Sequence, residues 1–225
     1  MNEYSSLKTL ALATMVFLAL NGLASLVAIP SAMMQMDVLD RIDQGTIGQD
    51  EIEANDARES ALGLVTMGLY FVTAIVFVAW FHRAYKNLDH FGHQREHGTG
   101  WAIGAWIAPI ISLFRPFQMA REIWHASDPE RGNEWAPPSS PPLLSTWWAL
   151  WIIGNVVGQI AFRMSLGAET VDDFRTSTTV QIGIDALNLV SVPFAILVVR
   201  ELTRRQETRA ERMARGAEDL AKVFE

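Results

Sequence analysis

Cysteine is absent from the sequence, and charged residues are scarce, at 19% of 225 positions. Without cysteine the chain has no disulfide, no thiolate metal ligand and no cysteine nucleophile. Soluble domains carry about 25% charged residues, so the low fraction points away from a soluble protein. An excess of basic residues is also missing, since 18 Lys and Arg face 25 Asp and Glu, a net charge of −7. This balance excludes a nucleic-acid-binding protein, because no basic domain stands out.

Motifs of the common enzyme classes are missing as well. The sequence has no phosphate-binding GxxxxGK[ST], no zinc-binding HExxH, no nucleophile motif GxSxG and no dinucleotide-binding GxGxxG. The acidic residues between positions 37 and 59 follow helical spacing and do not match a calcium-binding loop. We therefore expect a non-enzymatic protein that uses no cofactor and no metal.

What the sequence does have is four long apolar runs. A helix needs about 20 apolar residues to cross the hydrocarbon of a bilayer, and its backbone must satisfy its own hydrogen bonds there. The runs predict an all-α membrane protein whose four transmembrane helices cover residues 9–29, 60–81, 143–162 and 176–199. The first run is too long for the core of a signal peptide, so we expect it to be an uncleaved anchor that ends near Pro30.

A fifth uncharged stretch, Trp101–Phe114, is too short for a span and contains Pro109. Its length is typical of a re-entrant or interfacial segment. Pro116 suits the first turn of a following helix, so we expect a re-entrant or interfacial helical hairpin over about residues 101–124. Together with the four spans it forms the predicted integral membrane domain, residues 1–199.

Basic residues predict how the chain crosses the membrane, because Lys and Arg resist translocation. If the fifth stretch does not cross, 14 Lys and Arg lie inside and 4 outside; if it crosses, the best division is 12 to 6. The first arrangement is therefore favoured. It leaves both termini in the cytoplasm, with residues 200–225 as a charged helical tail.

Tryptophan supports the same arrangement. All eight tryptophans fall between Trp80 and Trp151, and indole prefers the headgroup region of a membrane. In the four-span arrangement all eight gather at or near the cytoplasmic face, whereas five spans would divide them between two faces. We therefore expect a tryptophan-rich cytoplasmic face.

Four stretches resemble a known bacterial family: residues 80–88 (WFHRAYKNL), 100–109 (GWAIGAWIAP), 115–127 (RPFQ to EIWHAS) and 147–151 (WWALW). The chain resembles the domain-of-unknown-function 4328 family of multi-pass membrane proteins over most of its length. The resemblance implies a protein of the bacterial inner membrane. It implies no activity.

Polar residues inside the predicted spans form a candidate intramembrane site. Asp185 and Asn188 share one helix face with Gln181, and a second helix carries further polar residues on one face. The predicted site consists of Asp185, Asn188, Asn155, Gln159 and Arg163. A carboxylate in hydrocarbon needs a partner, for which we expect Arg163. The group forms either an ion, proton or solute site, or hydrogen bonds between helices worth about 0.6 kcal/mol each.

A second candidate site lies at the predicted cytoplasmic interface. Basic and aromatic residues gather around the hairpin, and broken backbone at membrane depth must be buried or line a cavity. The predicted site consists of Arg83, Lys86, Trp101, Trp106, Pro109, Arg115, Arg121 and Trp124. Its cations are placed to meet lipid phosphates. The alternative is a plug that completes the packing of the helices.

Two further patterns have plain alternatives. His90, His93 and His97 with Glu96 have the chemistry of zinc ligands, but their spacing matches no zinc motif, and a solvated loop is favoured. Gly154 and Gly158 form a GxxxG pair, which permits a homo-oligomer but is more often used for packing within one bundle.

The most consistent functional hypothesis is a scaffold, or a protein that binds lipid headgroups or a protein partner, through the tryptophan-rich cytoplasmic face. The alternative is a small transporter or channel whose polar site surrounds Asp185. Apart from the bilayer itself, the sequence identifies neither the ligand nor the partner.

Overall fold

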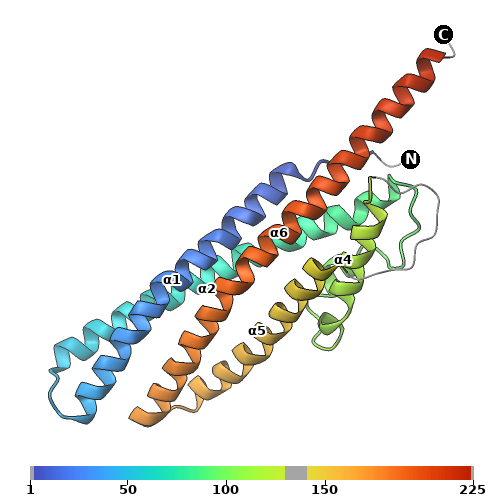
Figure 1. The fold of residues 1–225 in the computed structure, drawn as a ribbon. Helices are drawn as coiled ribbons and strands as arrows, with labels where there is room; N and C mark the ends of the chain where they lie inside the picture. Colours follow the sequence, from blue (N-terminus) through green and yellow to red (C-terminus); the bar gives the residue numbers. More distant parts are fainter. Residues whose placement is uncertain (1–2, 130–140, 224–225) are drawn as a thin grey trace. The chain divides into compact units, whose positions relative to one another are not determined.

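The computed structural model describes residues 3–129 and 141–223, which form helices and turns without a strand among them. Four helices are long: α1 (Lys8–Asp43), α2 (Gln49–Lys86), α5 (Pro142–Leu166) and α6 (Val171–Val223) (Figure 1). Four are short: η1 (Asn87–Asp89), α3 (Trp101–Gly104), η2 (Ile111–Leu113) and α4 (Arg115–Ala126). The predicted all-α fold is confirmed. Arg131 and Trp135, which entered the charge and tryptophan arguments, lie outside the described residues.

Each of the four long helices contains one of the four predicted spans. Each contains a window long and apolar enough to cross a membrane, and between 6% and 22% of the residues in each window are buried inside the protein. Leu64 and Ile75 of α2, for example, are 66% and 69% exposed. Apolar surface on this scale does not persist in water, so the helices face lipid and the chain is a membrane protein. The direction in which each helix crosses stays a prediction.

Pro30 does not end the first helix, contrary to the sequence prediction. Proline removes one helical hydrogen bond, yet α1 continues through Pro30 to Asp43. The reason is packing beyond the proline, where α1 lies beside the first part of α2. The Ser31 hydroxyl donates a hydrogen bond to the Glu59 carboxylate at 2.6 Å. The Arg41 guanidinium forms a bidentate ion pair with the Glu51 carboxylate, with N···O distances of 2.7 and 3.0 Å.

Two compact units divide the chain, and each of the long helices contributes to both. Unit 1 consists of Met1–Val16, Ala74–Trp148 and Ile196–Glu225. Unit 2 consists of Phe17–Thr73 and Ala149–Ala195. The candidate interfacial site belongs to unit 1, and the candidate intramembrane site belongs to unit 2.

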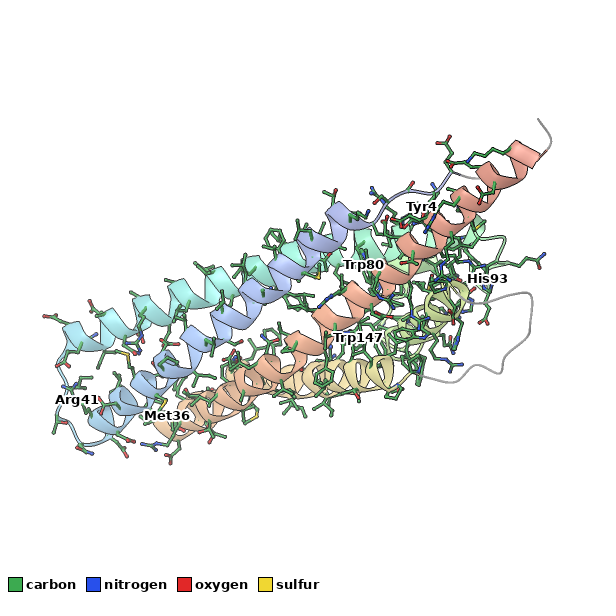
Figure 2. The ribbon with its side chains drawn as sticks, turned by 45° about the horizontal axis from the view of Figure 1, so that its top comes forward. Tyr4, Met36, Arg41, Trp80, His93 and Trp147 are labelled. Carbon is green, nitrogen blue, oxygen red and sulfur yellow. The ribbon has the colours of Figure 1, made fainter. Side chains whose placement is uncertain are left out.

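The core of unit 1 is built from large aromatic side chains. Trp80 and Phe81 of α2 are fully buried. Trp106 meets Phe77 and Phe81 edge to face, at ring-centre distances of 5.2 and 5.4 Å. Figure 2 labels Trp80 and Trp147, which both belong to this unit. Aromatic pairs in this geometry add about 0.5–1.5 kcal/mol each beyond their buried area. They hold the segment after α3 onto α2.

Gln206 of α6 joins four parts of unit 1 from a fully buried position. Its amide donates to the Ala84 carbonyl oxygen at 2.8 Å and to the Ser127 hydroxyl at 3.1 Å, and it accepts from Asn87 at 3.1 Å. Asn87 in turn binds the backbone of Ser5. The helix α6 therefore passes the predicted domain boundary at residue 199 without a break and remains packed.

Candidate functional site

The intramembrane polar site of unit 2 centres on Asp185, which is only 7% exposed. The hydroxyl of Ser25 on α1 donates to its Oδ1 at 2.8 Å, and the Gln181 amide donates to its Oδ2 at 3.1 Å. Asn188 completes the group by donating to the Ser25 hydroxyl at 2.8 Å. Two polar side chains from α1 and α6, Ser25 and Gln181, thus bind the carboxyl group directly, and a third, Asn188, binds Ser25.

Arg163 is not the partner of Asp185, contrary to the sequence prediction. Arg163 is exposed, and within residues 3–129 and 141–223 it forms no ion pair. Gln159 is also exposed, and the Asn155 amide donates to the Trp151 carbonyl oxygen of its own helix. The structure therefore brings Asp185 and Asn188 together and leaves the α5 members of the predicted site apart. Ser25 takes their place because α1 packs closely on α6, where Gly22 faces Val192.

The predicted hairpin contains no helix long enough to cross a membrane. After α3 the chain turns, and the Ser112 hydroxyl donates to the Pro109 carbonyl oxygen at 2.8 Å. Helix α4 then begins with Pro116 in its first turn, as the sequence predicts. Several apolar side chains of this segment are exposed, among them Ile107 at 77% and Ile110 at 76%. We name as the apolar ridge Ile103, Ile107, Ile110, Leu113 and Phe114.

Four basic residues of the predicted interfacial site share an electrostatic property. In the part of the chain that the structure describes, none of them pairs with a carboxylate: Arg83, Lys86, Arg115 and Arg121. Other arginines of unit 1 do have acidic partners, such as Arg95 with Asp89 at 2.6 Å. Within the described residues, no carboxylate therefore neutralises these four positive charges.

The aromatic members of the predicted site lie in different surroundings. The Arg115 guanidinium carbon is 4.7 Å from the centre of the Trp101 ring. The Arg205 guanidinium carbon is 4.1 Å from the centre of the Trp124 ring. Trp106 belongs to the aromatic core, and Pro109 is exposed. Arg83 lies apart from these residues and donates to the Ser6 carbonyl oxygen at 3.2 Å. Trp101 and Arg115 are therefore the pair that the structure brings together at the end of the ridge.

A buried carboxylate that the sequence analysis missed holds the loop before the ridge. Glu122 of α4 accepts hydrogen bonds from the Tyr85 hydroxyl at 2.6 Å, the Glu96 N–H at 2.8 Å and the His93 ring at 3.0 Å. The Tyr85 oxygen also accepts the His97 N–H at 3.0 Å. Burial opposes the charged form, but the donors outweigh it and lower the pKa of Glu122 from its ordinary value. Burial and the bond to Glu122 raise the pKa of Tyr85.

The histidine loop is thus not wholly solvated. His93, labelled in Figure 2, binds Glu122. The Nδ1 atom of His97 lies 3.4 Å from a guanidinium nitrogen of Arg115. No group of three metal-ligating side chains occurs in the described residues. The two glycines of the GxxxG pair also differ: a Cβ on Gly154 would contact Leu187 of α6, whereas Gly158 faces open space.

Comparison with known proteins gives one family. The profile described as "Domain of unknown function (DUF4328)" matches residues 43–204, which is well over half of the chain. No curated protein and no solved structure matches the sequence. The matched range includes the apolar ridge, the unpaired cations, Glu122 and Asp185. The chain belongs to the domain-of-unknown-function 4328 family.

Proposed function

We propose that the protein binds anionic lipid headgroups at the cytoplasmic face of the bacterial inner membrane, and that it does so without catalysing a reaction. The observation that carries this proposal is the order of residues at the end of the predicted hairpin. An exposed apolar ridge is followed directly by Arg115, and Arg121 follows on α4. Apolar residues in the acyl region with arginine at headgroup level are typical of interfacial membrane segments.

The ridge supplies the apolar part of the contact. Ile107, Ile110 and Phe114 are between 60% and 77% exposed, and they lie outside the four spanning windows. Full burial of such a side chain is worth about 1.5–3 kcal/mol. Because α3 and η2 are too short to cross, these side chains reach hydrocarbon most readily by dipping into one leaflet.

The cations supply the electrostatic part. A Lys or Arg near an anionic membrane surface contributes about 1 kcal/mol, provided that no carboxylate of the protein already neutralises it. Arg115 and Arg121 meet this condition within the described residues, as do Arg83 and Lys86. The guanidinium fork also matches the geometry of phosphate oxygens.

The start of α4 supports an anion in particular. Its N-cap residue Phe114 offers no side-chain hydrogen bond, and its first turn contains no acidic residue. The partial positive charge of a helix N-terminus therefore lies beside Arg115. A phosphate oxygen near Arg115 would be stabilised by this partial charge.

The test is native mass spectrometry of the full-length protein in mild detergent with added phosphatidylglycerol or phosphatidylethanolamine. We expect preferential retention of phosphatidylglycerol, and a loss of about fivefold in its affinity for each of Arg115→Ala and Arg121→Ala, since about 1 kcal/mol corresponds to that factor.

Arg204→Ala is the matched control, because it removes the same charge from unit 1 at a residue already paired with Glu201 at 2.6 Å. It should leave lipid retention unchanged. Equal retention of both lipids, or equal losses in all three variants, would refute the proposal. A protein partner that copurifies independently of Arg115 would instead favour the scaffold hypothesis.

A further inference from the structure

We propose that Asp185 is an intramembrane proton-binding site, whose buried carboxyl group takes up and releases a proton. The site lies in unit 2 and is independent of the lipid-binding proposal for unit 1. Nothing in the family description assigns it.

Asp185 lies deep within its predicted span. Asp185 is the only ionisable residue of the apolar run 176–199 and lies nine residues into it. At about 1.5 Å per residue this places the carboxyl near the middle of the hydrocarbon. An ionised carboxylate is unfavourable there unless a cation lies beside it.

The described helices place no such cation beside the Asp185 carboxyl group. The neighbouring α1 has no charged residue between Lys8 and Asp37. The same holds for the predicted spans of α2 and α5, and Arg163 at the end of α5 is exposed. On α6 the nearest cation is Arg175, which pairs with Asp40 at 2.9 Å and Asp172 at 2.5 Å. Toward the α1–α2 turn, Arg58 and Glu59 bind Ser31 and each other.

Among the described residues, every hydrogen-bond partner of the Asp185 carboxyl group is a neutral hydroxyl or amide. Ser25 and Gln181 donate to its two oxygens, and Asn188 donates to Ser25. A hydroxyl and an amide can each accept as well as donate. The same partners therefore satisfy the carboxyl with or without its proton, after a hydroxyl rotation or an amide flip. A site that serves both states permits exchange without repacking the helices.

Further polar side chains lie near Asp185 and its partner Ser25. Gln181 is exposed and lies one helical turn from Asp185 toward the start of α6. Asn21, one turn from Ser25 on α1, donates to Thr73 of α2. Polar side chains thus lie one turn from Asp185 on α6 and one turn from Ser25 on α1.

The test uses dicyclohexylcarbodiimide, an apolar reagent that adds to protonated carboxyl groups. The purified full-length protein is treated across a pH series in sodium-free buffer, and modification is measured on peptides by mass spectrometry. At pH 7 an exposed aspartate is only about 0.1% protonated. We therefore expect modification of Asp185 to exceed that of the exposed Glu169 and Asp172 by about a hundredfold, and to decline at higher pH.

Two results would overturn the proposal. One is modification of Asp185 only in the acidic range in which exposed carboxylates react. The other is protection by sodium ions at constant pH, which would identify a metal-cation site instead. Ser25→Ala retains the carboxyl and should remain reactive at pH 7, whereas Asp185→Asn should lose modification at this position. The main measurement uses the unaltered protein, so it does not depend on the folding of either variant.

Discussion

The Tyr85 hydroxyl of α2 donates a hydrogen bond of 2.6 Å to Oε2 of Glu122 on α4, and both residues are buried in unit 1. The second carboxylate oxygen accepts from the Glu96 N–H and contacts His93. One buried carboxylate therefore joins α2, the loop before the ridge and α4. Because the ridge lies between that loop and α4, this junction determines how the ridge is presented.

Removing the phenol should weaken unit 1. In Tyr85→Phe a buried carboxylate loses a donor, which costs about 1–3 kcal/mol. We expect a lower unfolding temperature in detergent. Tyr70→Phe is the control, since Tyr70 is 62% exposed and its hydroxyl forms no hydrogen bond with any described residue. Equal unfolding temperatures for the two variants would show that the junction contributes nothing.

Acid should weaken the same junction. The pKa of Glu122 is lowered from its ordinary value of 4.5, so its contribution to the free energy of unfolding is fully present above that pH. It is lost as the pH falls below 4.5 and through the lower pKa of the folded state. We expect Glu122→Gln to show a smaller loss of stability on acidification than the unaltered protein in parallel denaturant titrations. An identical loss in both proteins would mean that other carboxylates account for it.

Close packing of α1 on α6 predicts a difference between two glycines of unit 2. A Cβ on Gly22 would lie 3.4 Å from Val192, whereas one on Gly158 would meet nothing within 4 Å. Gly22→Leu should therefore destabilise the protein by about 1–3 kcal/mol, as overpacking does, while Gly158→Leu should be tolerated. The comparison is made by thermal unfolding in detergent. Strong destabilisation by Gly158→Leu alone would instead indicate a close contact at the GxxxG face, as in a homo-oligomer.

The spans could be predicted from the sequence because their signal is local. An uncharged run of about 20 residues has few structures available in lipid, and all four predicted runs lie within long helices. The start of α4 was predictable for the same reason, from Pro116. The predicted helix end at Pro30 was wrong, because the residues that stabilise α1 beyond Pro30 include Arg58 and Glu59, which lie far from it in the sequence.

The candidate sites could be predicted only in part. The helical spacing of Asp185 and Asn188 places them on one face, but which helix packs against that face is a tertiary property. Ser25 therefore replaced Arg163 as the partner. Glu122 was missed because its partner Tyr85 lies on another helix, 37 positions away, and no spacing rule connects them. The exposure of Ile107 and Ile110 likewise depends on what the rest of unit 1 covers.

The most direct test of the account is cysteine accessibility on the two sides of the ridge. The chain has no cysteine, so Gln94→Cys, Gln118→Cys and Thr46→Cys can each be labelled alone, and all three positions are exposed. In intact and permeabilised cells, a membrane-impermeant maleimide should reach Gln94→Cys and Gln118→Cys from the cytoplasmic side and Thr46→Cys from the other side. Labelling of positions 94 and 118 from opposite sides would contradict the account, because the ridge would then cross the membrane.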